Sequence, residues 1–208
     1  MSGRTRLVVA SLNPSKAREI AEVLSAAGLG FEVVGLSEFP EVELPPEVGE
    51  TFAANAMAKA AHVARATGLA AIADDSGLEV EALDGAPGVR SARFAGEGAG
   101  DAGRYGKLLD LMREAPDDRR QARFRCAAAY ATPGGETLLA EGECRGRIGR
   151  APKGSGGFGY DPVFVPEGYE CTMAELRPEE KHAISHRGRA FRALAEMIRE
   201  QVGGKVPG

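Results

Sequence analysis

The first third of the chain alternates between two spacings of hydrophobic residues. Residues 6–10 form a short apolar run that predicts a buried strand, and residues 14–27 carry apolar side chains three and four positions apart, which predicts a helix. The same pattern then predicts, in chain order, a strand at 31–35, a polar loop to Glu50, a helix over 52–66 and a strand at 70–73. Strands that alternate with helices in this way are typical of an α/β fold.

The remainder of the chain departs from this alternation. Residues 85–100 are rich in glycine and predict a loop, whereas residues 124–132 and 137–147 predict the two strands of a hairpin around Pro133-Gly134-Gly135. The other expected elements are a helix at 102–114, a strand at 163–165, a closing helix at 185–202 and loose tails at 1–5 and 203–208. Together these elements predict one domain over residues 1–208, built on a mixed sheet with flanking helices.

Composition restricts the class of protein. The 208 residues are 43% hydrophobic and 27% charged, which allows a substantial core, and no apolar run approaches the roughly 18 residues of a membrane span. The N-terminus carries no secretion signal, and Cys126, Cys144 and Cys171 lack the number and spacing of a disulfide framework or a zinc site. The net charge of −4 disfavours a sequence-independent nucleic-acid binder, which needs a basic face. We therefore expect a cytoplasmic protein that binds neither nucleic acid nor membrane.

The segment Ser11-Leu12-Asn13-Pro14-Ser15-Lys16 follows the first predicted strand. Asn13 is a favourable N-cap and Pro14 a favourable first residue of a helix. The N–H groups at such a helix start favour an anion, whereas Lys16 places a cation at the unfavourable end of the helix dipole. The segment therefore fits either phosphate binding or an ordinary cap beside a solvated lysine.

Carboxylates follow at two places in the chain. Glu47 lies in the loop before the second predicted helix, and Asp74 and Asp75 end the strand at 70–73. Two converging carboxylates are a common ligand set for Mg²⁺, but neighbouring strand residues point to opposite faces, so only one aspartate is expected to serve. The alternative is that both aspartates begin an Asp-Ser-Gly turn.

Lys59 falls on the apolar side of the second predicted helix, with Asn55 one turn earlier at the edge of that side. A lysine in this position commonly extends its stem along apolar surface and keeps its charge in water. It can equally reach inward toward Asp75. Both interpretations agree with the sequence.

Two late segments carry candidate base-binding groups. Residues 154–159 match GxGxxG, but a loop precedes them and a strand follows, which is not the dinucleotide-binding arrangement. With Phe158 and Tyr160 they fit either a loop on which a base stacks or an ordinary turn. At the closing helix, His186 and Arg187 offer donors for the polar edge of a purine, although such residues are also common at surfaces.

Taken together, these segments resemble the inosine triphosphate pyrophosphatase family, including its bacterial dITP/XTP pyrophosphatases, from Leu7 to about Leu194. The motifs that carry the resemblance are Ala73-Asp74-Asp75-Ser76-Gly77-Leu78, Gly85-Ala86-Pro87-Gly88, Ser91-Ala92-Arg93, Gly157-Phe158-Gly159-Tyr160-Asp161-Pro162 and Ser185-His186-Arg187. The resemblance implies an elongated α/β fold with two lobes around a central substrate cleft, assembled as a homodimer. It also implies Mg²⁺-dependent hydrolysis of dITP, ITP and XTP to the monophosphate and pyrophosphate.

The resemblance assigns roles by position. It implies that Asp75 binds Mg²⁺ and acts as the catalytic proton acceptor, and that Glu47 is a second metal-side carboxylate. The residues expected to bind substrate are Ser11, Leu12, Asn13, Pro14, Ser15, Lys16, Asn55, Lys59, Ser76, Phe158, Gly159, Tyr160, Asp161, Lys181, His186 and Arg187. Two positions depart from the family pattern, because Ser11 replaces a common threonine and Ala54 replaces a common acidic residue.

Two other functions agree with the same residues. One is a related pyrophosphatase for a modified pyrimidine nucleotide, and the other is a regulator that binds a nucleotide without turning it over. The pair Glu47 and Asp75 disfavours the regulator, since a sensor needs no catalytic carboxylate.

Overall fold

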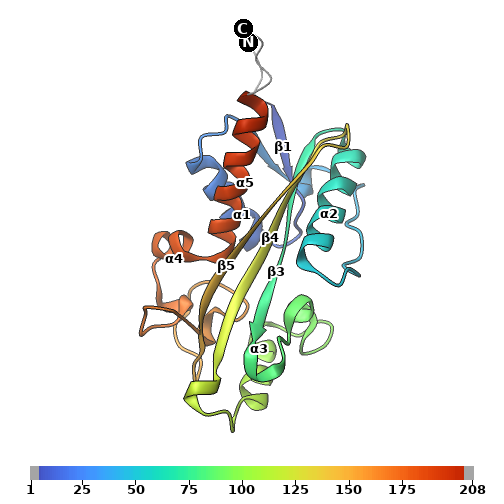
Figure 1. Ribbon diagram of the computed structural model, residues 1–208. Helices are drawn as coiled ribbons and strands as arrows, with labels where there is room; N and C mark the ends of the chain where they lie inside the picture. Colours follow the sequence, from blue (N-terminus) through green and yellow to red (C-terminus); the bar gives the residue numbers. More distant parts are fainter. Residues whose placement is uncertain (1–4, 204–208) are drawn as a thin grey trace. The chain divides into compact units, whose positions relative to one another are not determined.

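The computed structural model describes residues 5–203 (Figure 1). Its strands and longer helices are, in chain order, β1 (Arg6–Val9), α1 (Pro14–Ala26), β2 (Glu32–Gly35), α2 (Phe52–Thr67), β3 (Ala70–Val80), α3 (Asp101–Leu111), β4 (Gln121–Ala131), β5 (Thr137–Ile148), β6 (Phe164–Pro166), α4 (Pro178–Ile184) and α5 (His186–Gly203). Most of the predicted tails, at 1–4 and 204–208, lies outside the described residues. Over the described part of the chain, no helix is long and apolar enough to cross a membrane.

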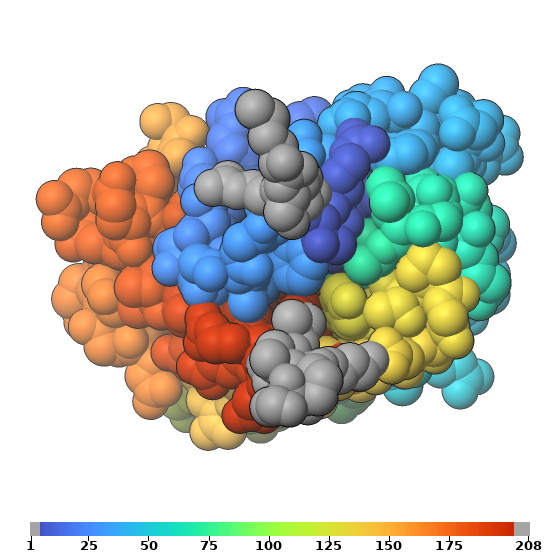
Figure 2. Space-filling view, turned by 90° about the horizontal axis from the view of Figure 1, so that it is seen from above, coloured from blue at the N-terminus to red at the C-terminus, as the bar shows by residue number. Residues whose placement is uncertain are grey.

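The strands form one six-stranded sheet in the order β2-β1-β3-β4-β5-β6. Strand β1 runs parallel to both β2 and β3, whereas β5 runs antiparallel to β6. A turn at 132–136 joins β4 to β5 and is closed by a 2.9 Å hydrogen bond from Thr132 N–H to the Glu136 carbonyl. This turn lies at the surface in Figure 2. The expected α/β fold with a mixed sheet and flanking helices is confirmed.

Two helix starts show why the sequence folds as predicted there. Asn13 caps α1, with Oδ1 accepting from the N–H groups of Ser15 and Lys16, and Thr51 Oγ1 caps α2 by accepting from Ala54 N–H at 3.1 Å. Because position 54 is alanine, the first turn of α2 has this single cap rather than a reciprocal capping box.

Three elements differ from the sequence prediction. Strand β3 runs seven residues beyond Ala73 to Val80, because Leu78 and Val80 continue the buried side of the strand. Helix α4 was not predicted, since it is short and buries Lys181 rather than an apolar stripe. Within the expected loop at 85–100, Gly88–Arg93 form a 3₁₀ helix.

Internal contacts divide the chain into two compact units. Unit 1 takes in the described residues of Met1–Asp75, Cys126–Gly142 and Arg187–Gly208, and unit 2 consists of Ser76–Arg125 and Glu143–His186. Strands β3, β4 and β5 contribute residues to both units.

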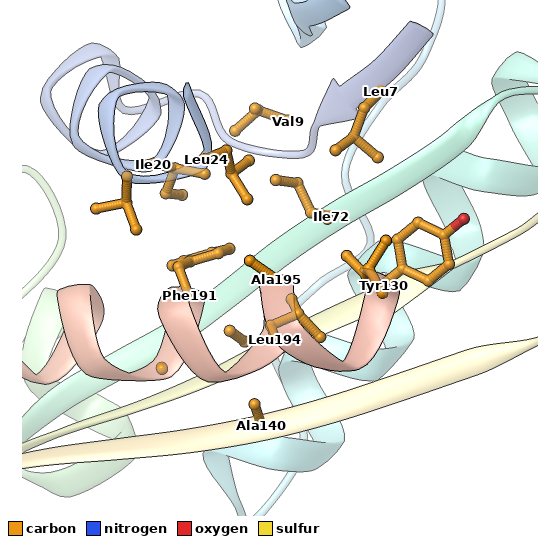
Figure 3. Packing of buried hydrophobic residues seen from close by; sticks show 14 of the residues in the cluster. Leu7, Val9, Ile20, Leu24, Ile72, Tyr130, Ala140, Phe191, Leu194 and Ala195 are labelled. Atoms are coloured by element: carbon orange, nitrogen blue, oxygen red, sulfur yellow. The ribbon is translucent and has the colours of Figure 1, made fainter. Parts of the chain in front are cut away.

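The core of unit 1 lies where α1 and α5 pack on the strands. Figure 3 shows Ile20 and Leu24 of α1 close to Phe191 of α5, with Leu7 and Ile72 of the sheet beside them. These five side chains are at most 2% exposed, and each contributes about 1.5–3 kcal/mol through its removal from water. These contacts hold α1 and α5 against the strands of unit 1.

The core of unit 2 is built from α3, the later parts of β3 and β5, the first part of β4 and the segment around β6. Leu108 of α3 and Met112, directly after it, pack with Leu78 of β3 and Phe164 of β6. The rings of Phe124 and Phe164 lie 4.5 Å apart and are tilted by 52°. This core supports the glycine-rich segment that follows β5.

Candidate active site

Asp74 and Asp75 lie within β3, and both are buried, with exposed fractions of 2% and 4%. Asp75 Oδ2 accepts a 2.8 Å hydrogen bond from Asn55 Nδ2 of α2, whereas Asp74 contacts side chains of α1 and α5. The prediction that these neighbouring carboxylates point in opposite directions is confirmed. The alternative, in which both begin a turn, is wrong because β3 continues past them.

The predicted phosphate-binding segment lies at the start of α1. Lys16 Nζ lies 3.3 Å from Asp74 Oδ2, and its side chain is 21% exposed. This carboxylate offsets the cost of a cation in the first helical turn. Lys16 is thus directed toward β3 rather than fully solvated, and phosphate binding by Ser11–Lys16 stays a prediction.

Lys59 is buried among carboxylates of unit 1. Its Nζ donates to Glu47 Oε1 and to the Asp74 backbone carbonyl, both at 2.5 Å. Burial lowers the pKa of Lys59, but the charges of Asp74 and Glu47 outweigh that effect and the pKa is raised. Lys59 therefore remains charged and points inward, and the interpretation in which it extends to water is wrong.

Asp75 has a pKa raised above the usual range of an aspartate. Burial is the main cause, and the nearby charge of Glu47 adds to it, while the hydrogen bond from Asn55 and the charge of Lys59 act in the opposite direction. A carboxylate with a raised pKa is a stronger base. Asp75 therefore suits the predicted role of proton acceptor.

Glu47 and Asp75 also suit a divalent cation. The charge of Glu47 raises the pKa of Asp75, and a hard cation bound by both groups relieves that repulsion. Within residues 5–203, no group of three or more His, Cys, Asp or Glu side chains is placed to hold a metal ion. The pair fits Mg²⁺ bound by one or two carboxylates together with substrate phosphates, which is its usual mode.

Arg187, at the start of α5, belongs to a buried ion-pair cluster in unit 1. Its NH1 lies 2.6 Å from Glu19 Oε2 of α1, and its Nε and NH2 each lie 3.3 Å from Asp74 Oδ2. Burial lowers the pKa of the guanidinium, but Asp74 and Glu19 outweigh it and raise the pKa. These contacts fix the plane of the guanidinium, and its recognition of a base stays a prediction.

Glu19, which pairs with Arg187, was not predicted from the sequence. The available signal was its spacing, because Glu19 follows Lys16 by three residues and so lies on the same side of α1. Its partner on α5 is 168 residues away, a distance that helical periodicity does not resolve.

The glycine-rich segment 154–161 forms an ordered turn in unit 2. Phe158 N–H donates to Asp161 Oδ2 at 2.9 Å, and the same oxygen lies 2.9 Å from Lys181 Nζ of α4. Lys181 Nζ also lies 4.8 Å from the centroid of the Phe158 ring. Three residues expected to bind the nucleotide are thus brought together.

Glycine is required at position 157 of this turn. Gly157 has a φ of +72°, and a β-carbon there would lie 2.1 Å from Asp161 Oδ2. Any side chain would therefore displace the carboxylate that holds Phe158 and Lys181.

Three other predicted residues of unit 2 lie in or beside its core. The Tyr160 hydroxyl donates to the Ser91 carbonyl at 2.9 Å, and burial raises the pKa of Tyr160. The His186 ring stacks on Phe124, with centroids 4.7 Å apart and planes 10° apart. Ser76 lies on β3 and is partly exposed. Contact of these residues with a nucleotide stays a prediction.

The predicted site residues divide between the units. Those of unit 1 carry most of the expected metal and phosphate contacts, and those of unit 2 most of the expected base contacts. Unit 1 holds Ser11–Lys16, Glu47, Asn55, Lys59, Asp75 and Arg187, and unit 2 holds Ser76, Phe158–Asp161, Lys181 and His186.

A cavity of about 970 Å³ in unit 2 contains none of these residues. It lies over the charged face of the strands, where Arg123 and Glu79 form a 2.7 Å ion pair and Arg147 pairs with Glu170. Its cations are already balanced by carboxylates of the same face, so we assign it no ligand.

Comparisons of the sequence and of the structure with known proteins point to the same family. The sequence model of the Ham1 family matches residues 7–197. A protein of Streptomyces coelicolor named dITP/XTP pyrophosphatase is 49% identical, over 96% of this chain and 100% of its own length. One of Mycobacteroides abscessus with the same name is 50% identical, over 95% of this chain and 96% of its own.

Solved structures show the same similarity. A HAM1 protein from Coxiella burnetii is 43% identical with a TM-score of 0.85, over 94% of this chain and 99% of its own. A nucleoside-triphosphatase (dITP/XTP pyrophosphatase) from Mycobacterium abscessus, known from a crystal structure, is 49% identical with a TM-score of 0.75. The match covers 94% of this chain and 100% of that chain.

Proposed function

The chain belongs to the Ham1 family, and from this membership we propose that it is a nucleoside triphosphate pyrophosphatase that hydrolyses dITP, ITP and XTP. The products are the nucleoside monophosphate and pyrophosphate. Relatives of about half identity over nearly the whole chain are named dITP/XTP pyrophosphatases. Within the structure, the observation that carries the proposal is buried Asp75, whose raised pKa reflects burial and the nearby charge of Glu47.

We assign Mg²⁺ as the cofactor, held by Glu47 and Asp75. When bound, the ion screens the negative charge of the triphosphate and stabilises the leaving group. Glu47 now pairs with Lys59. If Glu47 held a cation, the ammonium group of Lys59 would be free to bind a phosphate oxygen.

In this mechanism Asp75 orients a water molecule toward the α-phosphorus and accepts its proton. The bond between the α-phosphorus and the oxygen that bridges to the β-phosphorus breaks, and pyrophosphate leaves with that oxygen. Lys16, Lys59 and Lys181 offset the charge that remains on the phosphates.

Base selection follows from the polarity at position 6 of the purine. Hypoxanthine and xanthine present a 6-oxo acceptor, whereas adenine presents a 6-amino donor. Arg187 has donors only, and His186 donates from its protonated form or a suitable tautomer. Each donor left facing the amino group of ATP costs about 1–3 kcal/mol, so two give discrimination on the order of 10²-fold.

Steady-state kinetics with dITP, XTP, dATP and a modified dUTP, with MgCl₂ or with EDTA, test the proposal. We expect kcat/KM for dITP and XTP to exceed that for dATP by about 10²-fold and all turnover to stop in EDTA. A preference for the pyrimidine nucleotide supports the related pyrophosphatase instead. Tight binding without turnover identifies a regulator.

The oligomeric state of the enzyme is inferred from the family resemblance, and its cellular location from the composition of the chain. We propose that it acts in the cytoplasm as a homodimer, the assembly implied by the family resemblance. Sedimentation velocity tests the assembly, since a monomer at micromolar concentration contradicts it.

A further inference from the structure

The start of α3 supplies one contact to the glycine-rich segment 154–161. Asp101 Oδ2 accepts a 2.7 Å hydrogen bond from Gly159 N–H. Its other oxygen, Oδ1, lies 2.7 Å from NH1 of Arg104, one turn later on the same helix. Arg104 NH2 in turn donates to the Ala99 carbonyl at 2.9 Å. Both oxygens of Asp101 are therefore engaged, one with its own helix and one with the segment.

This contact differs from the other anchors of the segment. Gly156 N–H donates to the Ala174 carbonyl and Phe158 N–H to Asp161, and both acceptors come later in the chain. Asp101 lies 58 residues before Gly159 and belongs to a helix. It therefore ties the segment to α3, whose Leu108 lies in the core of unit 2.

The contact is strong relative to its surroundings. Hydrogen bonds to a carboxylate are shorter and stronger than those between neutral groups, and the contact with Arg104 holds this carboxylate in place. Packing does not hold Gly159, since a β-carbon there would meet nothing within 4 Å. The peptide that joins Phe158 to Gly159 is held at its carbonyl by a 3.3 Å hydrogen bond from Asp161 N–H and at its N–H by the shorter 2.7 Å bond to Asp101.

We propose that Asp101 is a positioning residue for base specificity, which acts by holding the Phe158–Gly159 peptide and thereby the Phe158 ring. The inference rests on the proposed function for its effect on selectivity. Asp101 does not touch the reacting phosphates in this account, so its loss weakens recognition of the base and leaves the chemistry at Asp75 intact.

The kinetic test compares Asp101→Ala, Asp101→Asn and the control Asp110→Ala. Asp110, near the end of α3, pairs with Arg113 at 2.6 Å in the same i,i+3 spacing, but both side chains are largely exposed. We expect Asp101→Ala to raise KM for dITP about 10-fold and to reduce the dITP advantage over dATP by a similar factor, with kcat within about 3-fold. Asp101→Asn keeps an oxygen acceptor for Gly159 N–H and should recover most of the selectivity. Asp110→Ala should match wild type.

Amide hydrogen exchange at Gly159 provides a readout that does not depend on activity. Exchange should be at least about 10-fold faster in Asp101→Ala than in wild type or Asp110→Ala. Asp101→Asn provides the comparison if the alanine variant does not fold. Unchanged exchange at Gly159, or one common fall in kcat for dITP and dATP with selectivity preserved, overturns the proposal. A wild type that hydrolyses none of the nucleotides refutes the proposed function, while exchange still tests the contact.

Discussion

The two units hold their candidate site residues by different kinds of interaction. In unit 1 the groups are charged and buried or partly buried, and each cation is paired with a carboxylate: Lys16 and Arg187 with Asp74, and Lys59 with Glu47. In unit 2 the glycine-rich segment takes its shape from backbone N–H groups that donate to carbonyls and carboxylates. Ion pairs can exchange partners when a metal ion and phosphates arrive, whereas a turn that needs glycine has one shape. We therefore assign the paired lysines of unit 1 to the triphosphate and the glycine-rich segment of unit 2 to the base.

The largest expected effect is at Asp75. Asn preserves the size of the side chain but removes the base, so Asp75→Asn should lower kcat by at least about 10²-fold. The melting temperature should change little, because the amide oxygen still accepts the hydrogen bond from Asn55. Stopped assays at saturating Mg²⁺ measure the effect. Near wild-type turnover shows that another group is the base.

The next effect is on stability in unit 1. Arg187→Ala removes the cation shared by buried Asp74 and partly buried Glu19 and leaves Lys16 beside Asp74, which should cost about 3 kcal/mol and lower the melting temperature by on the order of 10 °C. Arg113→Ala is the control, because its 2.6 Å pair with Asp110 is exposed and should contribute at most about 1 kcal/mol. Equal melting temperatures for the two variants contradict the buried cluster.

The same Arg187 variant tests base recognition. If Arg187 reads the base, the ratio of kcat/KM for ITP to that for ATP should shrink by about 10-fold or more. A fall by one common factor for both nucleotides assigns Arg187 to structure or phosphate binding instead.

A smaller effect distinguishes two glycines of unit 2. Gly157→Ala carries the cost of its positive φ and places a β-carbon 2.1 Å from Asp161 Oδ2, whereas Gly159→Ala, at φ +66°, meets nothing within 4 Å. We expect Gly157→Ala to raise KM for dITP about 10-fold and Gly159→Ala about 3-fold or less. Equal effects show that backbone conformation alone matters and that the Asp161 contact does not.

The last prediction concerns which cysteines react with a thiol reagent in the native protein, and it involves no change in activity or stability. Burial raises the pKa of Cys126, which lies in the core of unit 1, and Cys144 is buried in unit 2. A thiol reagent should therefore modify only the partly exposed Cys171 in the native protein. Mass spectrometry before and after denaturation gives the count, and rapid native labelling of Cys126 contradicts a closed core.

The sequence predicted the main elements because their signals are local. Asn13 and Pro14 mark the start of α1 by their own chemistry, and the apolar spacing of α1 and α5 follows one period. The length of β3 was underestimated because Asp74, Asp75 and Ser76 are typical turn residues. Only the strands beside them show that such polar residues continue a strand.

The site was predicted in part for the same reason. The strand period separated Asp74 from Asp75, and the apolar side of α2 identified Lys59. The partners of these groups come from distant segments, as Glu19 does for Arg187 and Asp101 for Gly159, and no local pattern joins them. Burial and pairing of charged groups therefore required the structure.

The most direct test of the account is the fate of the solvent oxygen. The enzyme is incubated with dITP and Mg²⁺ in H₂¹⁸O, the products are separated, and their masses are measured by mass spectrometry. If Asp75 directs water at the α-phosphorus, one ¹⁸O appears in dIMP and the pyrophosphate is unlabelled. Label in pyrophosphate, or formation of dIDP with orthophosphate, contradicts the account.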